Sequence, residues 1–185
     1  MKIYTRKGDD GSTGLFYGGR VAKDATGPEA YGTVDEANSA LGVARAVAQE
    51  SDPMLAEQLL FIQRELFVVG AELATGPANH EKLEPGVSRV HEGMVAGLER
   101  AIDAIVEGRG MPTEFVVPGG NPLAAAIDVA RTVIRRAERR AVAHASAAGI
   151  EGSHVVPYLN RLADYLYMAA RAAEAAWTPS RSEEQ

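Results

Sequence analysis

Apolar side chains recur every three or four residues through most of the chain, and such side chains share one face when the segment is helical. The pattern predicts five helices, over residues 28–50, 53–74, 86–107, 122–148 and 154–177. The second has the clearest start, because Asp52 is a good N-cap and Pro53 suits the first helical turn. Gly76-Pro77 ends the same helix.

The rest of the chain carries no helical pattern. Residues 1–27 are polar, with five glycines between positions 8 and 19 and at most a short extended piece at Ile3–Thr5. Phe115–Val117 is a predicted extended segment that ends in a glycine turn. Residues 75–84 are a predicted loop, and we expect residues 178–185 to be disordered.

Five helices with short connections and no alternating strand pattern predict an all-α fold. We expect an antiparallel five-helix bundle, with a ferritin-like four-helix core plus one helix, in a single domain over residues 1–185. Within it, residues 1–27 would form an extended N-terminal loop, residues 28–177 the bundle and residues 178–185 a flexible tail.

Composition narrows the class of partner. The formal net charge of −6 disfavours binding to nucleic acid or to an anionic membrane surface. There are no cysteines, which excludes disulfides and thiolate chemistry. No stretch approaches the roughly 20 apolar residues of a membrane span, and the N-terminus lacks a signal-peptide core. We therefore expect a cytoplasmic protein.

The helix predicted over residues 122–148 holds the most informative charges. Arg131, Arg135 and Arg139 share one stripe with Glu138. A bound anion would relieve the mutual repulsion of the arginines, because a planar guanidinium matches phosphate oxygens. Glu138 would orient one of the guanidinium groups. A solvated, ion-paired helix face is the simpler explanation of this segment alone. Arg140 points the other way and is an expected surface residue.

Two further polar groups have functional and plain structural explanations. In the loop Thr5–Gly14, glycine N–H groups, hydroxyls and basic side chains are suited to an anion, although a flexible loop explains the pattern equally well. Asn160, Asp164, Tyr167 and Arg171 form a polar stripe on the last helix, for which ordinary amphipathicity is the simpler account. The four histidines lack metal-ligand spacing, so we expect no metal site built from them.

Four segments together resemble one known family, the PduO-type ATP:cob(I)alamin adenosyltransferases. They are YTRKGDDGSTGLF, EAYGTVDEANSALG, FVVPGGNPLAAAIDVARTVIRRAERR and YLNRLADYLYMAAR, and they occur in the family's order. The similarity spans roughly residues 3–175. No single segment is specific, but the combination is.

The resemblance implies a transferase that moves the 5′-deoxyadenosyl group of ATP to the cobalt of cob(I)alamin, with Mg²⁺ on the phosphates. It also implies a homotrimer with active sites at the subunit interfaces, and a reductase and an adenosylcobalamin-dependent acceptor enzyme as partners. A non-catalytic carrier of ATP or adenosylcobalamin is the alternative.

The resemblance also assigns roles to individual residues. Phe115 would lie against the lower face of the corrin, Arg131 would pair with Asp35 of the partner subunit, and Arg135 would act on the leaving phosphates. The nucleotide contacts would come from Thr5, Arg6, Lys7, Gly8, Thr13, Gly14, Lys23, Arg135, Arg136, Glu138, Arg139 and Asn160.

Overall fold

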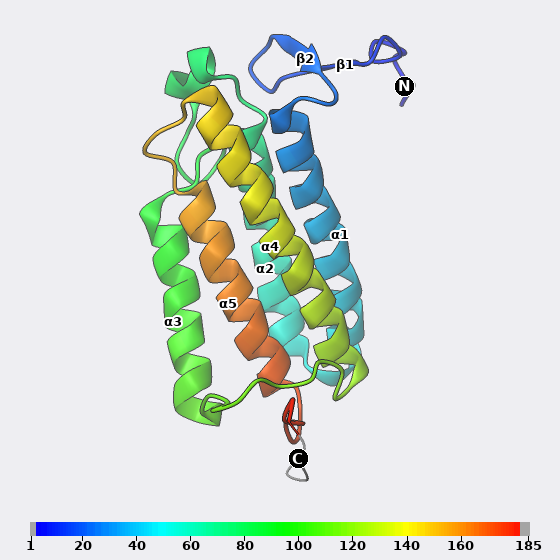
Figure 1. The fold of residues 1–185 in the computed structure, drawn as a ribbon, viewed down its shortest axis with the longest axis vertical. Coiled ribbons are helices and arrows are strands. Elements are labelled where there is room, and N and C mark those ends of the chain that lie inside the picture. Colours follow the sequence, from blue (N-terminus) through cyan, green and yellow to red (C-terminus); the bar gives the residue numbers. More distant parts are fainter. Residues whose placement is uncertain (1–2, 182–185) are drawn as a thin grey trace.

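Helical periodicity produces five long helices in the computed structural model, which describes residues 3–181 (Figure 1). They are α1 (Thr26–Ser51), α2 (Pro53–Leu73), α3 (Glu92–Arg109), α4 (Pro122–Ala148) and α5 (Val155–Ala172). The predicted all-α bundle is confirmed. Among residues 3–181, no helix is long and apolar enough to cross a bilayer.

Local capping sets several helix ends. The Asp52 carboxylate accepts a hydrogen bond from the backbone N–H of Leu55 at 3.0 Å, as the sequence predicted. The Asn121 side chain does the same for Ala124 at the start of α4, at 2.8 Å. At the other end of α4, Gly149 adopts a left-handed conformation (φ 64°), which ends the helix.

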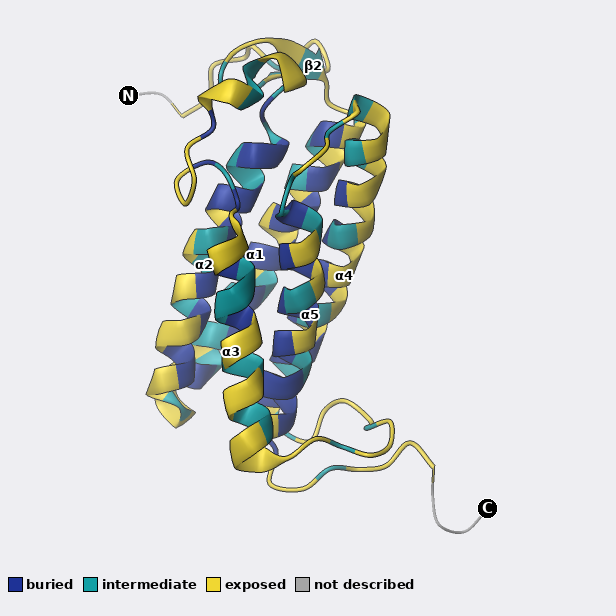
Figure 2. Ribbon diagram, turned by 90° about the vertical axis from the view of Figure 1, so that its left-hand side faces the viewer, coloured by how far each residue is buried: buried dark blue, intermediate teal, exposed yellow. Residues whose placement is uncertain are grey.

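The helices run up and down beside one another, and their apolar faces meet in one core (Figures 1 and 2). Helix α4 packs against both α1 and α5, while α2 packs on α1 and α3 on α5. Fully buried side chains from four helices fill the centre, among them Leu41, Leu59, Ile127 and Leu159. Helix α3 contributes only two buried residues, Met94 and Leu98, so it is the most peripheral helix.

The N-terminal segment forms a hairpin that the sequence did not predict. Strands β1 (Ser12–Gly14) and β2 (Arg20–Ala22) pair antiparallel, and Gly18 and Gly19 make the turn with positive φ. The hairpin lies beyond the end of the bundle where α1 begins (Figure 1). Its turn is fastened to the end of α2, because the N–H of Phe16 donates to the carbonyl of Ala74 at 3.0 Å.

Two predicted helix boundaries and one predicted loop are corrected. The third helix begins at Glu92 instead of residue 86, because a tight turn at Gly86 (φ 76°) brings the N–H groups of residues 87–89 to the carbonyl of Glu84. The predicted loop 75–84 contains a short 3₁₀ helix, Pro77–Lys82. The last helix ends at Ala172, five residues before its predicted end.

The chain after α5 is held against a distant segment. The N–H of Val117 donates to the carbonyl of Thr178 at 2.9 Å, and the N–H of Ser180 donates to the carbonyl of Phe115 at 2.7 Å. The prediction of disorder is therefore corrected for residues 178–180. Residues 1–2 of the predicted loop and 182–185 of the predicted tail lie outside the described residues.

Candidate functional site

Two of the predicted arginines line a groove between α3, α4 and α5. The groove has a volume of about 440 Å³, and Arg131, Arg135, Arg161, Asp164 and Tyr167 line it together with apolar side chains. The guanidinium of Arg131 lies over the ring of Tyr167, 5.9 Å from its centroid. Three acidic side chains, Glu99, Asp103 and Asp164, line the groove beside the three arginines. The groove thus combines apolar walls with charged groups of both signs, and its arginines can bind an anionic group of a ligand that also has an organic body.

Arg135 is the exposed cation of this groove. Among the described residues its guanidinium makes no hydrogen bond or ion pair, although its backbone carbonyl accepts a bond from Arg139 at 2.9 Å. Arg161, by contrast, is bound to Glu99 at 3.1 Å and to Asp164 at 2.8 Å. Arg135 therefore has its charge-assisted donors available for an incoming anion.

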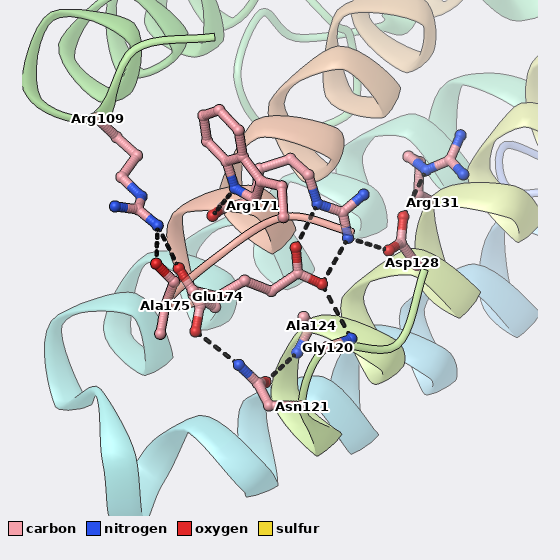
Figure 3. A network of polar contacts seen from close by, with 11 residues as sticks. Arg109, Gly120, Asn121, Ala124, Asp128, Arg131, Arg171, Glu174 and Ala175 are labelled. Carbon is pink, nitrogen blue, oxygen red and sulfur yellow. Dashed lines mark hydrogen bonds and ion pairs between the residues drawn. The ribbon is translucent and has the colours of Figure 1, made fainter. Parts of the chain in front are cut away.

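Arg131 has a partner that the sequence reading missed. Its Nε donates to Oδ1 of Asp128 at 3.0 Å, and Asp128 is only 4% exposed (Figure 3). The signal was present, because an acid three residues before an arginine is a standard helical pair. Asp128 thus fixes the direction of Arg131 from inside the bundle.

The other charged residues singled out on α4 face two different helices, α5 on one side and α1 on the other. Glu138 accepts a hydrogen bond from the side chain of Asn160 at 3.0 Å, so these two predicted residues from α4 and α5 lie together. Arg136 points the other way and pairs with Glu36 on α1. Arg140 pairs with Glu29 at 3.1 Å and is half exposed, in agreement with its predicted surface role.

Asp35 lies on a different face from Arg131 within one chain. It is exposed on α1 and lines the grooves between α1 and α2, next to Asn38 and the exposed ring of Phe67. Neither of these grooves shares a residue with the groove of Arg131. The structure therefore does not bring Asp35 and Arg131 together inside one subunit.

The N-terminal loop is organised by Arg20, another residue the sequence reading missed. Its guanidinium donates to the carbonyl of Lys7 at 2.5 Å and, through Nε, to the hydroxyl of Ser12 at 3.0 Å. Ser12 in turn donates to Asp10 from its N–H and hydroxyl, and these bonds lower the pKa of Asp10. Lys23 lies beside Gly8, since a Cβ added there would be 3.2 Å from the lysine Nζ.

The predicted nucleotide-binding residues of this loop are all exposed or half-buried. They are Thr5, Arg6, Lys7, Gly8, Thr13, Gly14 and Lys23. Arg6 has a positive φ of 60°. The loop lies at one end of the bundle, and the segment between α3 and α4 lies at the other (Figure 1).

Phe115 is the most exposed of the large apolar side chains of that segment. Its side chain is 85% exposed, although its backbone is tied to Ser180. A large aromatic side chain left in water gains roughly 1.5–3 kcal/mol when an apolar surface covers it. The position is suited to contact with a flat, apolar ligand.

Arg171 corrects the predicted polar stripe of α5. It is fully buried, at 0% exposure, and its guanidinium binds Asp128 at 2.6 Å and Glu174 at 2.9 Å (Figure 3). The sequence predicted a solvent-facing residue because helical spacing places it one turn from Tyr167. Two buried carboxylates, one of them 43 positions away, make its burial possible.

His144 joins the last part of α4 to the start of α1. Its Nδ1 lies 3.1 Å from the hydroxyl of Thr26, while its buried Nε2 has no hydrogen-bond partner among the described residues. Burial lowers the pKa of His144, and the neighbouring His80 adds to the effect. The neutral imidazole is therefore the form that suits the folded chain.

We expect this histidine to make stability fall in mild acid. The folded pKa of His144 is below the unfolded value of about 6.5, so the unfolded chain binds more protons in that range. The stability is fully present above about pH 6.5 and is lost as the pH falls through the folded pKa. Melting temperatures at pH 5.5–7.5 should drop less in His144→Gln than in the parent chain; equal slopes would contradict this assignment.

Comparison with known proteins places this arrangement in a family. The family described as Cobalamin adenosyltransferase matches residues 3–173. The corrinoid adenosyltransferase of Mycobacterium tuberculosis is 44% identical over 184 residues, covering 96% of this chain and 93% of that protein. The corrinoid adenosyltransferase of Bacillus subtilis is 42% identical, covering 95% of this chain and 88% of that protein.

Solved structures agree with the sequence comparison. A phenylalanine-to-alanine variant of the PduO-type ATP:corrinoid adenosyltransferase of Lactobacillus reuteri, complexed with cobalamin and ATP, matches with a TM-score of 0.86 and 33% identity. The match covers 98% of this chain and 100% of that one. The chain therefore belongs to the cobalamin adenosyltransferase family. Within that family it is of the PduO type.

Proposed function

We propose that this chain transfers the 5′-deoxyadenosyl group of ATP to the cobalt of cob(I)alamin, giving adenosylcobalamin and triphosphate. The observation that carries the proposal is the exposed guanidinium of Arg135, which is unpaired among the described residues, in a groove where Arg131 and Arg161 are ion-paired, on a chain of this family. The solved Lactobacillus reuteri enzyme, which is complexed with both cobalamin and ATP, supports the same pair of substrates.

The reaction needs little acid or base chemistry from the protein. Cob(I)alamin is itself a strong nucleophile, so its cobalt attacks C5′ of ATP, the C5′–O bond breaks and triphosphate leaves with the electron pair. The protein must hold C5′ in line with the cobalt and neutralise the leaving charge. We assign the second task to Arg135, to Lys23 and to the N–H groups of the loop Thr5–Gly14.

The nucleotide contacts are proposed for the residues that the family resemblance indicated. Alongside Arg135 they are Thr5, Arg6, Lys7, Gly8, Thr13, Gly14, Lys23, Arg136, Glu138, Arg139 and Asn160. Glu138 and Asn160 already lie together at 3.0 Å, which supports a shared role. Arg136 must leave Glu36 or bind ATP while keeping it.

Magnesium is proposed to enter with ATP. Among the described residues, no group of three acidic or histidine side chains is arranged to hold a metal ion. Mg²⁺ commonly takes most of its ligands from phosphates and water, so the protein need supply few. When bound, it would neutralise part of the phosphate charge beside Lys23.

On the corrin side we assign Phe115 to the lower face. There it would displace the lower axial ligand of cob(II)alamin, giving a four-coordinate species that is easier to reduce to cob(I)alamin. Its 85% exposed ring and its tethered backbone support this role, because the ring is free to contact a ligand while the chain that carries it is held.

A homotrimer with its sites between subunits is the assembly we propose. Asp35 and Arg131 line separate grooves of one subunit, so their pairing requires Asp35 of the partner subunit. The loop Thr5–Gly14 and the segment of Phe115 also lie at opposite ends of one bundle (Figure 1), which supports a site completed by a neighbour. Sedimentation that returns the mass of a single chain at micromolar concentration would contradict this assembly.

The decisive experiment mixes the purified chain with MgATP and chemically reduced cob(I)alamin without oxygen. Conversion to the light-sensitive adenosylated product, with release of triphosphate, is the expected result. Tight binding of both ligands without turnover would favour the alternative, a non-catalytic carrier. We further propose that the protein acts in the cytoplasm, where ATP is available, with a separate reductase and an adenosylcobalamin-dependent acceptor enzyme.

A further inference from the structure

A buried cluster of charges lies next to the segment between α3 and α4 that carries Phe115. Arg171, Glu174 and Asp128 are 0%, 3% and 4% exposed, respectively. The guanidinium of Arg171 donates to Oδ2 of Asp128 at 2.6 Å and to both carboxylate oxygens of Glu174, at 2.9 and 3.1 Å (Figure 3). One buried cation thus holds a carboxylate from α4 and another from the chain beyond α5.

Burying these charges costs desolvation free energy, which apolar side chains in the same place would not cost. Each ion loses its hydration, and apolar side chains of the same volume often stabilise a fold equally well or better. The benefit that apolar residues could not supply is direction, because each carboxylate has a second oxygen or a second lone pair that can position another group. Both carboxylates use this capacity toward the proposed site.

The first connection runs to Arg131. Asp128 accepts from Arg171 with Oδ2 and from Arg131 with Oδ1, at 3.0 Å. The guanidinium groups of Arg131 and Arg171 also lie over the same ring, Tyr167, at 5.9 and 5.3 Å from its centroid. Asp128 therefore fixes the direction in which the side chain of Arg131 extends from α4.

The second connection runs to the segment that carries Phe115. Glu174 Oε1 accepts from the N–H of Gly120 at 3.1 Å, just before the start of α4 (Figure 3). The fit is tight: a Cβ at Gly120 would lie 2.8 Å from Glu174 Oε1 and 2.9 Å from its Cδ. Glycine is required there because the carboxylate occupies the space of a side chain.

Contacts of residues 177–180 also fix the backbone of the segment that carries Phe115. The indole N–H of Trp177 donates to the carbonyl of Arg171 at 2.9 Å, and Arg109 lies over the indole ring at 5.3 Å. Immediately after it, Thr178 and Ser180 bond to the backbone of Val117 and Phe115. The segment of Phe115 is thus fixed at one end by Gly120 and along its length by residues 178–180.

We propose that the Arg171–Asp128–Glu174 cluster is a positioning device that fixes Phe115 and Arg131 in one arrangement, with Glu174 as the positioning residue for Phe115. The inference rests on the proposed function, since it uses the roles assigned to those two residues. It assigns Glu174 no contact with either substrate. Loss of Glu174 should therefore impair the step that depends on Phe115 more than the step that depends on ATP.

The test compares two reactions of the same variant. Glu174→Gln and Gly120→Ala are assayed with MgATP, first with chemically reduced cob(I)alamin and then with cob(II)alamin plus dihydroflavin as a mild reductant. We expect turnover from cob(II)alamin to fall at least tenfold in both variants, while turnover from cob(I)alamin and the KM for ATP change less than threefold. Gly120→Ala keeps every charge, so it serves even if Glu174→Gln does not fold.

Two controls separate positioning from loss of stability. Asp52→Ala removes the cap of α2 without touching the cluster and should lower both reactions equally or not at all. Fluorescence of Trp177, the single tryptophan, reports the cluster without an assay and should shift in both cluster variants. An equal loss in the two reactions, no loss in either, or unchanged fluorescence would overturn the proposal. Failure of the parent chain to turn over cob(I)alamin would instead refute the proposed function.

Discussion

Phe115→Ala should lower turnover from cob(II)alamin by roughly a hundredfold, while the affinity for ATP stays within twofold. The side chain is 85% exposed and has no packing role to lose, so the change should leave the fold intact. Covering a phenylalanine ring contributes roughly 1.5–3 kcal/mol, or about ten- to a hundredfold. Without the ring, the lower axial ligand is no longer displaced, and this lowers turnover from cob(II)alamin further.

The assay for this variant uses the same two cobalamin states. With cob(I)alamin supplied chemically the deficit should shrink, because reduction is no longer required. Phe61→Ala is the matched control, since Phe61 is also exposed, at 59%, but lines a groove that shares no residue with the grooves of Arg135 and Asp35. Normal turnover of Phe115→Ala from cob(II)alamin would remove Phe115 from the mechanism.

Arg135→Ala should reduce kcat/KM for ATP by a hundredfold or more, and here both cobalamin states should be affected equally. Hydrogen bonds to charged groups contribute about 1.5–3 kcal/mol, and removing one donor to a developing negative charge typically costs a factor of about a hundred to a thousand in kcat. The guanidinium binds nothing else among residues 3–181. The substitution therefore leaves no internal partner unpaired, and the loss of kcat/KM reports the contact with ATP alone.

Two variants make this result specific. Arg135→Lys keeps the charge but not the planar fork, so it should recover only part of the activity. Arg140→Ala removes an arginine of the same helix that is bound to Glu29, and it should change kcat/KM less than twofold. Binding of ATP measured by calorimetry should weaken in Arg135→Ala; kinetics and affinity like those of the parent chain would exclude Arg135 from the site.

The contrast between Arg135 and Arg171 shows what helical spacing resolves. Spacing put Arg131, Arg135 and Arg139 on one stripe, and the structure confirms Arg131 and Arg135 in one groove. Helical spacing also predicted that Arg171 faces solvent, whereas it is among the largest fully buried side chains of residues 3–181. Which helix face is covered depends on neighbours distant in sequence, and a periodic pattern contains no information about them.

The same limit explains the two ends of the chain. Residues 178–180 carry no helical or strand pattern, yet they are ordered by backbone bonds to residues more than 60 positions away. The hairpin at residues 12–22 likewise depends on Arg20, whose guanidinium reaches back 13 positions to Lys7. Short polar segments have few local preferences, so distant partners decide their conformation.

The sequence by itself determined the five helices, the capping of α2 and α4 and the arginine stripe, because periodicity and capping are set by residues within a few positions of one another. The family's four segments were also readable in order along the chain. Only the tertiary structure decided that Asp128 and Glu174 bury a charge with Arg171, that Arg136 turns to α1, and that Phe115 is tied to residues after α5. Apart from the Arg171–Glu174 pair, which is three residues apart, these contacts join residues far apart in sequence. Their free energy exists only once the helices have packed.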